Sequence, residues 1–238
     1  MMLNLKLVQQ YREQGYCFVP GVFDQVSLDG FRQAANELED VVSPIERGKP
    51  RLQVEKDPDD GHAKLRMIEP LIDLSPTLRD LSADRRILGM VEQIFCEPAY
   101  LFEDKLNYKP ARVGSGFPLH QDWSYWKRYS NNLLSLFIHL DDAPLETGPM
   151  KLVPGTHRMG LLKTEDDGHH IGLEEIARRQ MLTFEANAGD VLIFHCLTAH
   201  ESEPNLSDKD RRAIVITYNP CSDGNQYRYS PELLSTYH

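Results

Sequence analysis

The spacing of hydrophobic residues changes along this chain, and the change falls near residue 100. In the first part they recur every three or four positions, as on one face of a helix. Helices are therefore expected at residues 5–14, 28–38 and 82–95. Either Asp24 or Ser27 is a suitable cap for the second helix. Residues 16–20 are strand-like, and the polar stretch 43–62 is expected to be a loop.

Beyond residue 100, short apolar runs are separated by turns that contain Gly and Pro. Strands are expected at residues 100–108, 132–140, 150–153, 180–186, 190–195 and 212–218. Residues 164–179 are interpreted as an insertion with a short helix near its end. Strands without β–α–β alternation are typical of an antiparallel sandwich or barrel. The sequence thus predicts a mainly β fold with flanking N-terminal helices, in one domain of residues 1–238.

Charge and cysteine content narrow the classes of partner. The formal net charge of −10 disfavours nucleic acid and anionic membranes, while an anionic small molecule remains compatible with a local basic pocket. The four cysteines lack metal-site spacing and are expected to be free thiols of a reducing compartment. No apolar run has the length of a signal peptide or membrane span. A cytoplasmic protein with a small-molecule substrate is expected, and the oligomeric state is left open.

The segment His120-Gln121-Asp122 is the strongest chemical signal. In a strand, residues two apart point to the same side, so an imidazole and a carboxylate would converge. His200 lies 78 residues beyond Asp122 and is a candidate for a third ligand. Two His and one carboxylate form the iron site of non-haem Fe(II) oxygenases. The alternatives are a surface pair at His120 and a solvent-exposed loop histidine at His200.

Arg211 opens the last expected strand and is a candidate clamp for a carboxylate. A guanidinium binds a carboxylate through two parallel hydrogen bonds, as the far end of 2-oxoglutarate requires. Arg212 competes for this role, and Arg211 itself is otherwise a solvated strand-end charge. Ser202 either adds a hydroxyl to the same carboxylate or belongs to a simple turn.

Trp123, Tyr125 and Trp126 follow the acidic residue and form either a wall of the substrate pocket or ordinary aromatic packing. The other histidines are given structural interpretations. His139 is expected to be a hydrogen-bonded residue inside a sheet, and His195 a packed residue near the site. The pair His169-His170 is expected to face water.

Several further segments carry a resemblance that covers nearly the whole chain. They are Gly15 to Gly21, Lys109-Pro110, Pro118 to Asp122, Thr147 to Met150, Pro154 to His157, Gly189 to His195, His200-x-Ser202-x-x-Asn205 and Arg211. With these motifs the chain resembles the phytanoyl-CoA dioxygenase family of Fe(II)/2-oxoglutarate-dependent oxygenases. The resemblance implies a double-stranded β-helix, also called a jelly roll, of the cupin-like type.

The resemblance also implies roles for single residues. His120, Asp122 and His200 match the Fe(II) ligands, and Arg211 matches the residue that clamps 2-oxoglutarate. A set of further positions matches the cosubstrate pocket: Ser202, Lys105 and Phe137, with Lys64 or Arg66 as a contributor from the N-terminal part.

The resemblance further implies a reaction type. Related halogenases have Ala or Gly at the position of Asp122, so the resemblance implies a hydroxylase. It would consume O2 and 2-oxoglutarate, oxidise an unactivated C–H bond, and release succinate and CO2. Desaturation and cyclisation stay open, as does the substrate. The alternative is a cupin-like metalloenzyme or a jelly-roll binding module without 2-oxoglutarate turnover.

Overall fold

The computed structural model describes residues 2–41 and 51–229. Within them, four α-helices lie in the N-terminal part: α1 (Leu5–Gln14), α2 (Gln25–Val41), α3 (Pro76–Ser82) and α4 (Arg85–Phe95). The side chain of Asn4 caps α1, and Asp24 caps α2 by accepting a hydrogen bond from the backbone of Ser27 at 2.9 Å. The sequence predicted α1, α2 and α4 but not α3.

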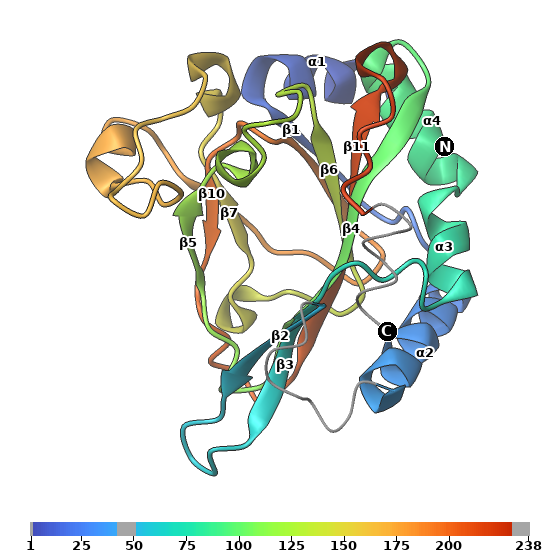
Figure 1. Cartoon of the computed structure of the whole chain (residues 1–238), viewed down its shortest axis with the longest axis vertical. Helices are drawn as coiled ribbons and strands as arrows, with labels where there is room; N and C mark the ends of the chain where they lie inside the picture. Colours follow the sequence, from blue (N-terminus) through green and yellow to red (C-terminus); the bar gives the residue numbers. More distant parts are fainter. Residues whose placement is uncertain (1, 42–50, 230–238) are drawn as a thin grey trace.

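The described residues form two antiparallel sheets that face each other (Figure 1). The larger sheet has the order β1-β9-β6-β11-β4-β3-β2, and the smaller has β5-β10-β7-β8. The strands are β1 (Tyr16–Val19), β2 (Leu52–Lys56), β3 (Ala63–Ile68), β4 (Ala99–Lys109), β5 (Phe117–His120), β6 (Leu134–His139), β7 (Met150–Leu152), β8 (Leu182–Phe184), β9 (Val191–His195), β10 (His200–Ser202) and β11 (Arg211–Pro220). This arrangement confirms the predicted jelly roll.

The outer face of the large sheet is covered by helices, which lie on the opposite side from the small sheet (Figure 1). Alternate residues of the central strands, such as Leu106, Ile138 and Ile214, are completely buried there. They belong to one apolar cluster with Leu28 of α2 and Val91 of α4. This core contains most of the buried aliphatic surface and therefore holds the sheet in place.

The inner face of the large sheet points toward the small sheet, and its strand register arranges residues in rows. Paired residues of neighbouring strands share a face, so each row runs across β4, β11 and β6. The rows are Glu103–Thr217–Ser135, Lys105–Val215–Phe137, Asn107–Ala213–His139 and, across β4 and β11 alone, Lys109–Arg211. Charged and polar side chains of the inner face thus alternate along β4 with Leu106 and Tyr108 of the outer face, which also carries the buried Asp104.

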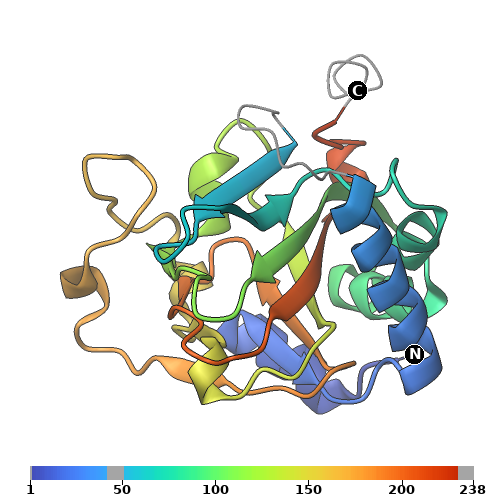
Figure 2. The ribbon, with the colours of Figure 1, turned by 90° about the horizontal axis from the view of Figure 1, so that it is seen from below.

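Two expectations about connecting segments are wrong in part. The predicted loop 43–62 contains β2, which pairs with β3, while residues 43–50 lie outside the described residues. β2 lacks the regular apolar alternation that would have revealed it, because most of its residues are only half-buried. In the insertion 164–179, the expected helix is a single 3-10 turn, Leu173–Ile176. Figure 2 shows this insertion projecting on the side away from α2, α3 and α4.

Candidate active site

Three side chains meet on the small sheet. His120 ends β5, His200 begins β10, and the two residues are direct partners in the register of these strands. Asp122 begins a 3-10 turn (Asp122–Tyr125) after the extended residue Gln121. The Asp122 Oδ1 atom lies 3.6 Å from His120 Nε2 and 3.7 Å from His200 Nε2. His120 thus lies at the end of a strand and Asp122 in the turn that follows it, whereas the sequence had predicted that both lie in one strand.

Both imidazoles are oriented by backbone carbonyls. His120 Nδ1 lies 2.7 Å from the Pro118 carbonyl oxygen, and His200 Nδ1 lies 2.9 Å from that of Thr198. Because a carbonyl only accepts, each Nδ1 carries the proton, and the Nε2 lone pair is available to a metal. Burial, followed by the charge of His120, lowers the pKa of His200 to about 4, so this ring is neutral.

The carboxylate of Asp122 is charged. Burial raises its pKa, but His200, His120 and Lys105 together outweigh burial and hold the pKa well below its usual range. The ligand atoms of His120, Asp122 and His200 all lie within 4.8 Å of one another. Two imidazole nitrogens and one carboxylate oxygen are the donor set of the 2-His-1-carboxylate iron site, so the residues fit an Fe(II) ion.

Gln121, to which the sequence analysis gave no role, fixes the turn between the ligands. Its side-chain amide donates to the carbonyls of Leu197 at 2.6 Å and Gly160 at 3.0 Å. Its Oε1 accepts from the backbone N–H of Leu162 at 2.8 Å. Three hydrogen bonds from a fully buried side chain hold His120 and Asp122 in their relative positions.

A cavity of about 540 Å³ extends between the two sheets from these ligands. Most of the predicted pocket residues line it: Lys105, Phe137, Ser202, Arg211, Tyr125, Trp126 and Arg66. Two candidates do not. Trp123 packs against the cluster around Phe102, and Lys64 lies near Asp57 at 3.7 Å with a half-exposed side chain.

At one end of the cavity, Lys109 and Arg211 form a cationic pocket. Lys109 Nζ donates to Ser202 Oγ at 2.8 Å and to the carbonyls of Gly148 and Glu203. Arg211 Nη2 donates to the same Gly148 carbonyl at 2.9 Å. Gly148 has φ +66°, and a Cβ there would meet the Glu203 oxygen at 2.1 Å, so only glycine allows this approach.

These two basic residues are direct cross-strand partners, which is unfavourable when both are charged and no anion lies between them. Among the described residues, neither Lys109 nor Arg211 forms an ion pair with a carboxylate. Burial and the charge of Arg211 lower the pKa of Lys109 to about 6, and burial lowers that of Arg211 to about 10. The arrangement is therefore suited to a buried anion. No local pattern indicated a pocket role for Lys109, although it shares the strand face of Lys105.

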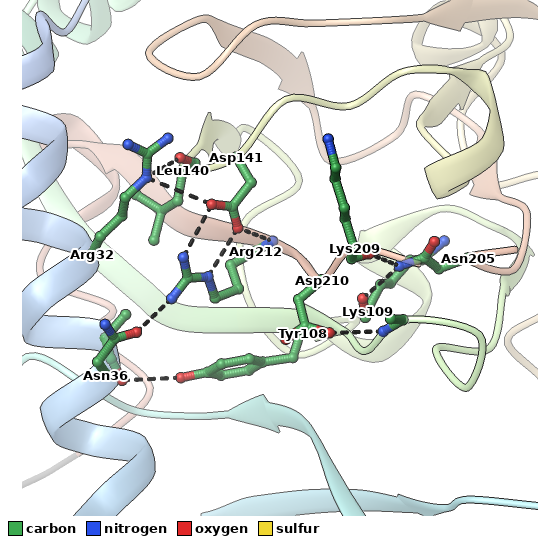
Figure 3. Close-up of polar contacts among 12 residues, drawn as sticks. Arg32, Asn36, Tyr108, Lys109, Leu140, Asp141, Asn205, Lys209, Asp210 and Arg212 are labelled. Carbon is green, nitrogen blue, oxygen red and sulfur yellow. Dashed lines mark hydrogen bonds and ion pairs between the residues drawn. The ribbon is translucent and has the colours of Figure 1, made fainter. Parts of the chain in front are cut away.

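The strand alternation places Arg211 and Arg212 on opposite faces of the large sheet. Figure 3 shows Arg212 on the outer side, bonded to Asp141 and Asn36. The Asp141 carboxylate also lies 3.5 Å from Arg32 of α2. Arg212 thus joins the sheet to the helix layer, while Arg211 is almost fully buried on the inner face.

The other end of the cavity carries a mixed network of charges. Glu103, which is fully buried, accepts a hydrogen bond from Lys105 at 2.8 Å and forms an ion pair with Arg228. Arg228 also contacts Glu69 at 2.9 Å, and Tyr229 donates to the same carboxylate. Two carboxylates and two cations therefore balance here. Arg228 comes from the C-terminal segment, whose sequence carries no pattern that would have placed it in the cavity.

The insertion lies against the mouth of the cavity. The ring of His169 stacks on Tyr125 at 4.2 Å, and Lys127 donates to the Gly168 carbonyl at 3.2 Å. His170 forms a β-bridge with His120 and lines the cavity. The expectation that His169 and His170 face water is therefore wrong in part, because both are half-buried and contact residues that are distant in the sequence.

Two interior histidines differ. His195 is packed as expected, and its Nδ1 accepts a hydrogen bond from the Leu197 backbone at 3.1 Å. His139 is completely buried, but neither ring nitrogen has a hydrogen-bond partner among the described residues, so the expected hydrogen bonds of this residue are not found.

The four cysteines are free, as predicted. Among the described helices, none has the length and apolar character that a membrane crossing needs.

A jelly roll with two histidines and one carboxylate beside its internal cavity is typical of non-haem Fe(II) oxygenases. Residues 11–213 match the phytanoyl-CoA dioxygenase (PhyH) family, and the chain belongs to that family. The expected enzyme class, an Fe(II)- and 2-oxoglutarate-dependent dioxygenase that uses O2, is thereby confirmed.

Individual relatives extend this result. The 2-aminoethylphosphonate dioxygenase of uncultured bacterium HF130_AEPn_1 is 28% identical over 221 residues, which cover 91% of this chain and 82% of that protein. The L-proline trans-4-hydroxylase of Streptomyces griseoviridis is 26% identical over 201 residues, which cover 74% of this chain and 75% of that protein. The solved structure of the epimerase SnoN with Fe3+, alpha ketoglutarate and nogalamycin RO gives a TM-score of 0.75 at 24% identity. The match covers 91% of this chain and 83% of that structure. This last likeness concerns the fold alone.

Proposed function

We propose that this enzyme hydroxylates a carbon atom of a small zwitterionic molecule, with Fe(II) held by His120, Asp122 and His200. The distal carboxylate of 2-oxoglutarate would bind to Lys109 and Arg211. One observation carries this proposal. The three donor residues line the same cavity as Lys109 and Arg211, two basic residues without a carboxylate partner among the described residues.

The metal ligands prepare the reaction by their protonation and position. When bound, Fe(II) with O2 and 2-oxoglutarate supplies the oxidant that breaks the C–H bond. His120 and His200 keep Nε2 free because their Nδ1 protons are held by carbonyls. Asp122 contributes the negative charge, and three protein ligands leave part of the coordination sphere for the cosubstrate.

The cationic pocket would select the cosubstrate. Arg211 offers a planar fork to a carboxylate, and Ser202 can donate its hydroxyl proton while its oxygen accepts from Lys109. Phe137 and Val215 form an apolar floor next to this pocket. They exclude water from the chain of the cosubstrate and so strengthen the ion pairs.

The mixed charges at the other end support a substrate that carries both signs. Glu103 and Glu69 suit an ammonium group, while Lys105 and Arg228 suit a carboxylate or phosphonate. Two relatives are named for molecules of this kind, 2-aminoethylphosphonate and L-proline. Trp126 lies between the two cations, with Lys105 Nζ 5.6 Å from its ring centroid and Arg228 6.0 Å. It would shape the substrate end.

The test is release of succinate from 2-oxoglutarate under air with Fe(II) and a panel of small zwitterions, including 2-aminoethylphosphonate and L-proline. We expect turnover with at least one member, and formation of its hydroxylated product by mass spectrometry. His120→Ala should lower the rate at least about a thousandfold, because the iron loses a ligand. His195→Ala, which changes a packed histidine outside the ligand set, is the matched control. Fe(II)-independent activity or retained activity in His120→Ala would contradict the proposal.

A further inference from the structure

The row Asn107–Ala213–His139 lies directly beside the cationic pocket. Its neighbour on one side is Lys109–Arg211, and both rows share the inner face of the large sheet. His139 is 0% exposed and neither ring nitrogen has a hydrogen-bond partner among the described residues. The Oδ1 atom of Asn107 and the Nε atom of Arg211 are buried in the same unpartnered condition. Three polar groups of this kind therefore occur in two adjacent rows.

The residue between them is small, so a single methyl group separates Asn107 from His139 along the row. Ala213 stands between Asn107 and His139 on the middle strand, and its side chain is a single methyl group. Arg211 is two residues from Ala213 on β11, so it is the diagonal neighbour of His139. Buried polar groups in proteins are paired or bridged by enclosed water, because an unmade hydrogen bond is costly.

The state of the His139 ring fits such a bridge. Burial, followed by the charge of Arg211, lowers the pKa of His139 to about 3, so the ring is neutral in ordinary buffers. A neutral imidazole has one donor and one acceptor nitrogen. Its contact with Phe137, at 5.1 Å between ring centroids, fixes its plane but uses neither nitrogen.

Among the described residues, the Arg211 guanidinium makes one hydrogen bond, from Nη2 to the Gly148 carbonyl, and its Cζ lies 5.8 Å from the Phe137 ring centroid. Its Nε–H has no hydrogen-bond partner there. Two-pronged binding of a carboxylate needs a fixed guanidinium plane. A second anchor at Nε would therefore determine how well the cosubstrate binds.

We propose that His139 is a positioning residue for the cosubstrate clamp: with Asn107 it holds the Nε–H of Arg211 through one enclosed water above Ala213. This inference rests on the proposed function, since it assumes that Arg211 binds the distal carboxylate of 2-oxoglutarate. The effect of His139 must then be confined to ligands that carry this carboxylate.

The experiment compares two ligands on the Fe(II) enzyme without O2, 2-oxoglutarate and 2-oxovalerate, which has a methyl group in place of the distal carboxylate. His139→Phe removes both nitrogens, and we expect about tenfold weaker binding of 2-oxoglutarate, the size of one hydrogen bond to a charged group. Binding of 2-oxovalerate should not change. His139→Gln, which restores a donor and an acceptor, should recover most of the affinity.

His195→Phe removes a second buried imidazole outside the cationic pocket, and we expect it to alter neither ligand's affinity. Equal weakening of both ligands by His139→Phe, or unchanged binding of 2-oxoglutarate, would overturn the inference. Failure of the wild-type enzyme to bind 2-oxoglutarate would instead overturn the proposed function.

A measurement on the wild-type protein covers the case in which His139→Phe and the smaller His139→Leu do not fold. With 15N-labelled histidine, a ring-nitrogen resonance of His139 should shift on addition of 2-oxoglutarate and stay in place with 2-oxovalerate. The same response to both ligands would contradict the role.

Discussion

The two faces of the large sheet come from the same strands, yet they are built on opposite rules. On the outer face, Leu106, Ile138 and Ile214 are fully buried against helices and make apolar contacts alone. On the inner face, the adjacent positions Lys105, Asn107 and Lys109 of β4 alternate with them and line the cavity. Period-two alternation lets one strand serve both purposes.

The two faces of the sheet contribute differently to the free energy of unfolding. Burying an aliphatic side chain of the outer face contributes about 1.5–3 kcal/mol. The inner face instead buries the basic side chains of Lys109 and Arg211, which have no carboxylate partner among the described residues, and desolvation of a charge there is unfavourable. The outer face stabilises a charge arrangement that would not be stable by itself. Substitutions at two adjacent positions of one strand should therefore differ in their effects on stability and on ligand binding.

The largest expected effect is on the outer face. Ile214→Ala should lower the free energy of unfolding by about 3 kcal/mol, because it leaves a cavity in a close-packed core. Urea denaturation measures the change, and the KM for 2-oxoglutarate should stay within about twofold. Its neighbour Val215, on the inner face, is the matched site. Val215→Ala should cost clearly less, because its side chain already borders the cavity. Equal costs at both positions would break the comparison.

The second effect is on the inner face. Arg211→Gln should raise the KM for 2-oxoglutarate about a hundredfold, because a two-pronged ion pair is lost. The free energy of unfolding should not fall, since no carboxylate of the described residues pairs with Arg211. Arg212→Gln is the control on the other face. It loses the bonds to Asp141 and Asn36 and should lower stability by about 1 kcal/mol without changing the KM. The reverse outcome would show that the two arginines have exchanged roles.

The smallest effect on ligand binding is a dependence on pH. The pKa of Lys109 is lowered from 10.5 to about 6, so between these values the unfolded chain holds a proton that the folded one lacks. The free energy of unfolding of the ligand-free protein therefore rises with pH across this window, and Lys109→Met should remove that rise. Binding of an anion raises the pKa of Lys109 again, so 2-oxoglutarate should bind with uptake of a proton.

Calorimetry in buffers with different ionisation enthalpies measures the number of protons that are taken up when 2-oxoglutarate binds. The affinity for 2-oxoglutarate should fall fewfold as the pH rises above about 6. Lys109→Met should abolish both the uptake and the slope, whereas Lys127→Met, at the mouth of the cavity, should retain them. Binding by the wild-type protein without proton uptake would show that Lys109 is charged before the ligand arrives.

Local patterns were sufficient for the elements that pack by simple periodicity. α1, α2 and most strands lie where apolar spacing placed them, because each buries one regular face. β2 was not found, since it is an edge strand whose half-buried residues show no clean alternation. The positions of Trp123 and His170 were also not predictable. Whether an aromatic or a histidine faces the cavity depends on how a turn and an insertion fold back on the sheets.

The amino-acid sequence by itself determined the chemical types at the site. It supplied two histidines and one aspartate at suitable spacing, an arginine at the start of the last strand, and motifs that implied the family. Only the tertiary structure decided which charges meet. Pairing of β4 with β11 places Lys109 opposite Arg211, and pairing of β6 with β11 brings His139 beside them. Strand register and burial set these contacts, and neither is encoded within a single segment of the chain.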